Sequence, residues 1–269
     1  MIKVFNMYFR MMIVLILSTI SSSIFAEGLY LQILNKTVLN AEQIQKSKQK
    51  IEKYKPIKVH EELVVPPFHK RGQMNASLEH SICTGCHLSP PHTKSDRTRT
   101  FMNMHTKFIA CETCHFRPET VKLSYRWEDV RDGKPLQAKQ KLFRQIAEPE
   151  EKPEERTKSL HSFYKITPFY QKESVVLRKQ SVFAKETTRL WEQGTLDEKS
   201  QHRALLHAPL KKEGPECQEC HDKQKNFLDL EGLGATAYQI EKIQNNIITQ
   251  FFSRYKDKQQ RIRIMSILR

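Results

Sequence analysis

Cys83-Thr84-Gly85-Cys86-His87 is the first of three copies of one pattern in this chain. The other two are Cys111-Glu112-Thr113-Cys114-His115 and Cys217-Gln218-Glu219-Cys220-His221. Residues three and four apart share one face of a helix, so a helical turn brings both thiols and the imidazole of each copy together. With 11 His among 269 residues, a His directly after all three pairs has a chance probability below about 1 in 10⁴. No Cys lies outside the three motifs.

This pattern is typical of covalent haem attachment. Thiols at i and i+3 can form thioethers with the two vinyl groups of one porphyrin, and the imidazole at i+4 can bind the iron. Two other interpretations use the same cysteines: three Cys-X-X-Cys disulfides, or a zinc ribbon built from the first two pairs, which are 24 residues apart. A zinc site needs no His directly after the second Cys, which favours haem. The expected attachment residues are Cys83, Cys86, Cys111, Cys114, Cys217 and Cys220, and the expected iron ligands are His87, His115 and His221.

With these motifs, and a His a short way upstream of each, the chain resembles the multihaem c-type cytochromes. The resemblance covers roughly Phe68 to Pro118 and Arg203 to Phe227. It implies three covalently attached haems c, irons held mostly by two axial His, and electron transfer between closely spaced haems. Catalytic members of the family leave one iron with an open position.

The second axial ligands are expected among the eight remaining His. His80, His105 and His207 lie three, six and ten residues before the Cys that opens the next motif. They resemble the upstream His that such cytochromes supply to a haem, often to a neighbouring one. The next candidates are His92, which follows two prolines, and His69. His60, His161 and His202 are weaker candidates.

Two methionines offer another kind of axial ligand. Met102 or Met104 could supply a thioether sulfur, which would raise the potential of a haem. Such residues more often pack against a porphyrin.

The first 26 residues have the composition of a secretory signal. Lys3 and Arg10 are the only charges there, and they precede an apolar stretch that ends before Ala26-Glu27. That stretch is shorter than the roughly 20 residues that a membrane span needs, although an uncleaved anchor remains an alternative. A signal peptide predicts a periplasmic or extracellular protein. That location agrees with the resemblance, which implies haem attachment outside the cytoplasm.

The chain is strongly basic, with a formal net charge of +15. Removal of residues 1–26 takes away two positive charges and leaves +13. Such a surface would attract a redox protein with an acidic docking surface, an anionic substrate or the surface of a membrane or respiratory complex. A solvated, lysine-rich surface without a partner is the other interpretation. No nucleic-acid-binding motif is present.

The predicted fold is mainly α, with irregular haem-wrapping loops and a small β insertion. Helices are expected at Asn40–Lys55, Val182–Gln193, Asp197–His207, Ala235–Lys242 and Asn246–Tyr255. Strands are expected at Val121–Trp127, Phe163–Phe169 and Ser174–Leu177, with a turn at Asp132-Gly133. The predicted segments are a signal at 1–26, a leader with an exposed helix at 27–67, a dihaem module at 68–118, a haem-free β insertion with a charged loop (Glu148–Lys158) at 119–180, and a helical module with the third haem at 181–269.

These observations favour an exported trihaem electron carrier in a respiratory chain. The alternative is a multihaem reductase or oxidoreductase of a small nitrogen or sulfur compound at one open haem. The positive charge of the chain would attract such a substrate if it is an anion. A structural or docking subunit of a cytochrome assembly is a third interpretation. The sequence alone leaves open whether the chain is an enzyme.

Overall fold

The computed structural model describes residues 28–54, 81–87, 92, 102–106, 108–136, 164–225 and 227–245. The elements in chain order are α2 (Leu29–Lys36), α3 (Ala41–Glu52), α4 (Cys83–Cys86), α6 (Cys111–His115), β1 (Ser124–Asp129), β2 (Tyr164–Tyr170), β3 (Glu173–Ser174), α9 (Val182–Gln193), α10 (Leu196–His207), α11 (Cys217–His221) and α12 (Ala237–Gln244). The predicted signal, the charged loop and the helix expected at Asn246–Tyr255 lie outside the described residues.

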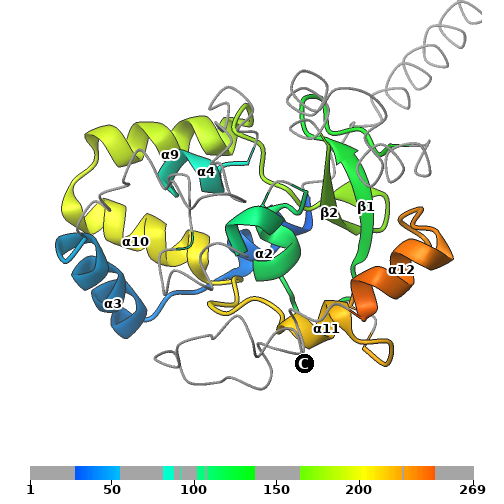
Figure 1. Cartoon of the computed structure of the whole chain (residues 1–269). Helices are drawn as coiled ribbons and strands as arrows, with labels where there is room; N and C mark the ends of the chain where they lie inside the picture. Colours follow the sequence, from blue (N-terminus) through cyan, green and yellow to red (C-terminus); the bar gives the residue numbers. More distant parts are fainter. Residues whose placement is uncertain are drawn as a thin grey trace, which may run out of the picture.

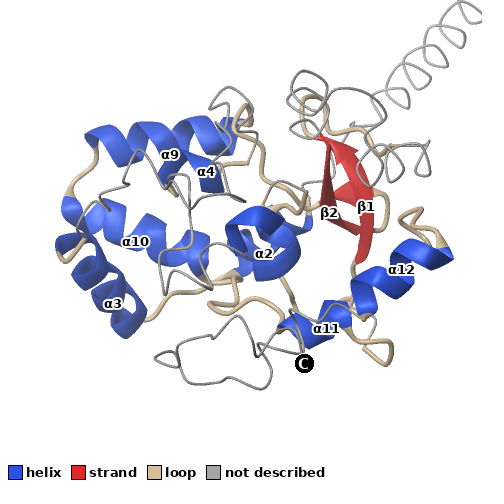
Figure 2. Cartoon of the chain, viewed as in Figure 1, coloured by secondary structure: helices blue, strands red, loops and turns tan. Residues whose placement is uncertain are grey.

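The elements form two groups. Helices α3, α9 and α10 gather on one side of the molecule, whereas the strands, α11 and α12 lie on the other, with α2 between them (Figure 1). Figure 2 shows that loops connect most of these elements. Within the described residues, no helix combines the length and the hydrophobicity needed to cross a bilayer.

Side-chain caps explain where four of the helices begin. Asn40, Ser181, Thr195 and Thr236 each accept a hydrogen bond from the backbone N–H three residues ahead. Such a cap satisfies one of the donors that a helix start leaves unpaired. Four helix predictions are therefore confirmed: α9 has the predicted bounds, and α3, α10 and α12 differ from the predicted ranges by one to three residues at an end.

Helix α2 was not predicted, and it belongs to the core. Its buried residues Leu29, Tyr30 and Leu34 pack in one cluster with Phe116, Val175 and Leu177. The Tyr30 ring stacks on the Phe116 ring with centroids 4.9 Å apart, and its hydroxyl donates to the Leu206 carbonyl at 2.6 Å. This helix thereby joins the second Cys-X-X-Cys-His motif to α10.

The three strands form an antiparallel sheet in the order β1-β2-β3. Trp127 of β1 pairs with Ile166 of β2, and Phe169 of β2 pairs with Ser174 of β3. The predicted hairpin is confirmed, although β3 is only two residues long. The first strand begins at Ser124 rather than Val121. The predicted turn is confirmed by Gly133, whose φ of 75° is unstrained only for glycine.

A buried ionic network holds the sheet to the segment that follows it. The Glu128 carboxylate accepts hydrogen bonds from Thr167 at 2.7 Å, Ser174 at 2.6 Å and the Arg178 guanidinium at 2.6 Å. Burial raises the pKa of Glu128, so these donors offset the cost of a carboxylate away from water. A side chain at Gly133 would collide with Arg178.

The sheet is attached directly to the second motif. Ile109 and Ile166 form a parallel bridge, and the Ile166 carbonyl accepts from the Ala110 N–H at 3.0 Å and from the Thr113 hydroxyl at 2.8 Å. The expected division into a dihaem module and a β insertion stays a prediction. These hydrogen bonds connect the two segments closely.

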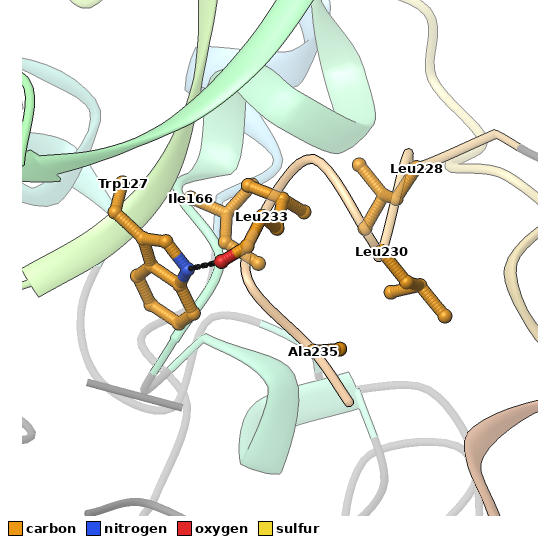
Figure 3. Packing of buried hydrophobic residues seen from close by; sticks show 6 residues of the cluster. All are labelled: Trp127, Ile166, Leu228, Leu230, Leu233 and Ala235. Carbon is orange, nitrogen blue, oxygen red and sulfur yellow. Dashed lines mark hydrogen bonds between the residues drawn. The ribbon is translucent and has the colours of Figure 1, made fainter. Parts of the chain in front are cut away.

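The main core lies between the sheet and the chain after the third motif. Trp127 and Ile166 pack with Leu228, Leu230, Leu233 and Ala235. The Trp127 indole N–H donates to the Leu233 carbonyl at 3.0 Å, as Figure 3 shows. Because Trp127 is 2% exposed, this hydrogen bond replaces one that water cannot provide.

We expect Trp127→Phe to destabilise the protein by about 1–3 kcal/mol, because the buried Leu233 carbonyl loses its donor and the smaller ring leaves a void. Denaturant unfolding of the haem-loaded protein measures this change. The matched control is Trp191→Phe, at the half-buried second tryptophan, which should cost less than about 1 kcal/mol. Equal losses for the two variants would contradict the assigned core.

Candidate haem-binding centres

Each Cys-X-X-Cys-His motif forms a short helical turn. The turns are α4, α6 and α11, and His87 directly follows the first of them. This confirms the helical conformation expected for the motifs, which places the two sulfurs of each on one face. In α11 the turn is stabilised by Glu216 and Glu219, whose side chains bond each other's backbone N–H.

The most informative feature of the structure is that each motif His lies beside one other His. The ring centroids of His87 and His207 are 6.1 Å apart. Those of His115 and His92 are 6.4 Å apart. Those of His221 and His105 are 6.0 Å apart. Two of these pairs bring together residues more than 100 positions apart in the chain.

These separations fit one iron between the two rings of each pair. A metal–imidazole nitrogen bond of about 2.0–2.1 Å places the centroids of two rings on opposite sides of one ion about 6.3 Å apart. Such ligation leaves each ring free to rotate about the line through the metal. The interplanar angles of 61°, 27° and 85° are therefore all compatible with it.

Hydrogen bonds orient four of the six imidazoles. The Nδ1 atoms of His115, His207 and His221 lie 2.7–2.9 Å from the carbonyl oxygens of Lys211, Arg203 and Ile243. A carbonyl only accepts, so each Nδ1 carries the proton and each Nε2 keeps its lone pair. Metal-binding His commonly has this second-shell arrangement.

His92 is held by a side chain instead. The Asn103 Oδ1 atom lies 3.0 Å from His92 Nδ1 and accepts from the His92 backbone N–H at 3.1 Å. The Asn103 amide group donates back to the His92 carbonyl at 3.3 Å. The sequence analysis did not single out Asn103, because nothing in the sequence distinguishes it from a surface asparagine.

Burial favours the neutral form of four of the paired His. It lowers the pKa values of His87, His92 and His221, and it lowers the pKa of His207 to about 4. Neutral imidazole is the form that binds a metal ion. The electrostatic environment of these rings therefore supports ligation at neutral pH.

The other candidate ligands are not placed beside a motif His in the described residues, for different reasons. His202 uses Nε2, the atom an iron would need, in a 2.8 Å hydrogen bond with the Thr187 hydroxyl. Met104 is 49% exposed. The expected ligands His69 and His80, like the weaker candidates His60 and His161, lie outside the described residues.

The six cysteines are all described, and all are free thiols. In the described part of the chain, no group of three or more His, Cys, Asp or Glu side chains is arranged to hold a metal ion. Burial also raises the pKa of Cys114 to about 11 and that of Cys220 to about 12. Haem attachment therefore stays a prediction, and it rests on the His that directly follows each Cys pair.

Comparison with known proteins adds no relative: no family model, curated protein or solved structure matches this chain.

We expect Asn103→Leu to weaken His92 as a ligand, because the similar-sized side chain cannot accept the Nδ1 proton. Second-shell losses of this kind typically lower metal affinity by about 10–100-fold. In the haem-loaded chain, one low-spin haem of three should convert to high spin at a higher pH than in the wild type. An absorbance titration measures this. Asn245→Leu, at an exposed position after α12, is the control, and identical titrations for the two variants would contradict the role of Asn103.

Proposed function

We propose that the chain is an exported trihaem c-type cytochrome that carries electrons through three low-spin, bis-His haems. The observation that carries this proposal is the set of three imidazole pairs, one for each motif, at centroid distances of 6.0–6.4 Å. The proposed ligand sets are His87 with His207, His115 with His92, and His221 with His105. His69 and His80 then have no axial role in the proposal.

Bound haem supplies one-electron chemistry at iron, and the chain tunes it. The six thiols attach the porphyrins, and the six imidazoles fill both axial positions of every iron. The backbone carbonyls at residues 203, 211 and 243, and the Asn103 amide, fix the orientation and basicity of four imidazoles. Burial and axial ligation are the main means by which a protein sets haem potentials.

The pairing favours a carrier over a reductase. A reductase needs one iron with an open position, and each motif His in this structure has a partner at the spacing of a filled iron. Within the described residues, one open pocket of about 290 Å³ beside the third motif is lined by Glu216, Glu219, Lys225 and Phe227. Its two carboxylates outnumber its one ammonium group, so the charge of this pocket would repel a nitrogen or sulfur oxyanion.

The proposed location and partners follow from the sequence. The signal-like segment at 1–26 supports export to the periplasm or beyond. The net charge of +15 supports docking to redox proteins with acidic surfaces, or peripheral association with a membrane or respiratory complex.

The direct test of this proposal is a spectrum of the chain expressed with haem-attachment machinery. We expect three covalently bound haems per chain and a reduced spectrum that carbon monoxide does not change, because no iron has a free position. One carbon monoxide-reactive haem per chain would favour the reductase instead. Absence of covalent haem would overturn the proposal altogether.

A second prediction concerns the proposed site of His87 and His207. We expect His207→Ala to open the iron bound by His87, so that carbon monoxide binds one haem in three and the other two remain low-spin. The control is His202→Ala in the same helix, which should leave all three haems unreactive. A wild-type spectrum for His207→Ala would contradict the assigned pair.

The pH dependence of this site follows from the lowered pKa of His207. An unperturbed His takes up its proton near pH 6.5, whereas the pKa of His207 is about 4. We therefore expect the low-spin spectrum of the first haem to be constant from pH 7 to pH 5 and to be lost only as the pH falls through about 4 or lower. Loss centred near pH 6.5 in an absorbance titration would contradict this.

A further inference from the structure

We propose that the three haems act in series, with the second haem as the central relay and the first and third as the two ends. This inference rests on the proposed function, and it goes further by giving the order of electron movement. It is carried by the contacts that the second motif makes with the other two sites.

The first and second motifs meet at the Cys83 sulfur atom and one buried carboxyl group. Cys83 lies against Glu112, the residue that directly follows Cys111 in the second motif. The carboxyl group of Glu112, inside the second motif, accepts from the Ser81 hydroxyl at 2.5 Å and lies 3.5 Å from Cys83 Sγ. Thioethers formed at Cys83 and Cys111 would therefore place the edges of two porphyrins side by side.

The second motif is also joined to the segment that leads into the third. The His115 carbonyl accepts from the Lys211 N–H at 2.7 Å, and the Arg117 guanidinium donates to the Glu213 carbonyl at 2.8 Å. Arg117 also lies 4.0 Å from the Glu219 carboxylate, within the third motif. Cys114 is close enough that a side chain at Gly214 would contact it at 3.5 Å.

The proposed distal ligands also connect the second site to the third. Asn103 holds His92 of the second site, and two residues later His105 pairs with His221 of the third. One helical turn, at 102–105, thus touches both sites.

The two outer motifs lie apart. In Figure 1, α4 and α11 are on opposite sides of α2. A projection can shorten a distance but never lengthen it, so these turns are separated in the molecule. With haems held by the three motifs, an electron from a reduced redox protein would enter at one outer motif, pass to the second motif and then to the other outer motif, and leave to an oxidised redox protein. At each step the donor would be oxidised and the acceptor reduced by one electron.

The test is to remove one haem at a time and measure the magnetic interaction between those that remain. We expect Cys111→Ala/Cys114→Ala, which lacks the second haem, to show two independent ferric signals in electron paramagnetic resonance. The matched variant Cys217→Ala/Cys220→Ala should retain a coupled pair. Coupled signals after loss of the second haem would overturn the series order. A haem count of three in the wild type separates this result from failure of the proposed function.

A milder variant keeps the inference testable if a haem-deleted chain does not fold. Glu112 is 1% exposed, and its Oε2 atom has no hydrogen-bond partner. Replacing its carboxyl group by an amide should therefore change the electrostatic field at the contact between the first two haems. We expect Glu112→Gln to raise two of the three midpoint potentials and to leave the third unchanged. Glu119→Gln, at an exposed carboxylate paired with Lys211, should raise none. A change in all three potentials, or in none, would place Glu112 away from this contact and overturn the assigned junction.

Discussion

The arrangement of this protein depends on holding two imidazoles about 6 Å apart at each of three places. The two rings of each pair lie side by side, although in two cases their residues are more than 100 positions apart. Several elements of the fold position these residues. Helix α10 positions His207 at its C-terminal end, and α11 positions His221. The helical turn at 102–105 carries His105, and its Asn103 holds His92.

The apolar cores serve as supports around the three centres. The cluster at Trp127 and Leu233 lies beside the third motif, and the cluster at Tyr30 and Phe116 lies beside the second. Phe116 directly follows His115, so its complete burial fixes the backbone beside this proposed ligand. This role also explains why the small sheet is bonded to the second motif through Ile166.

The proposed carrier function and the proposed order of haems depend on different observations. Carrier function depends on the filling of each axial position, which concerns pairs of rings. The series order depends on which motifs touch. The contacts are those of Cys83 with Glu112 and of Arg117 with the segment around Cys217. A basic surface adds a third, independent feature, because it bears on partners rather than on the internal route.

The sequence by itself determined the local features of this protein. The motif spacing predicts the three helical turns, and the local apolar spacing predicts α3, α9, α10 and α12, because helical periodicity acts within four residues. The sequence predicted five second ligands, His92, His105, His207, His80 and His69, and it could not assign any of them to a motif. Helix α2 was missed because its apolar residues pack with residues far along the chain, among them Phe116 and Leu177. Only the tertiary structure decided which His faces which motif, and it also revealed Asn103 and Glu112. Such contacts arise when distant segments pack together, and no local pattern records that packing.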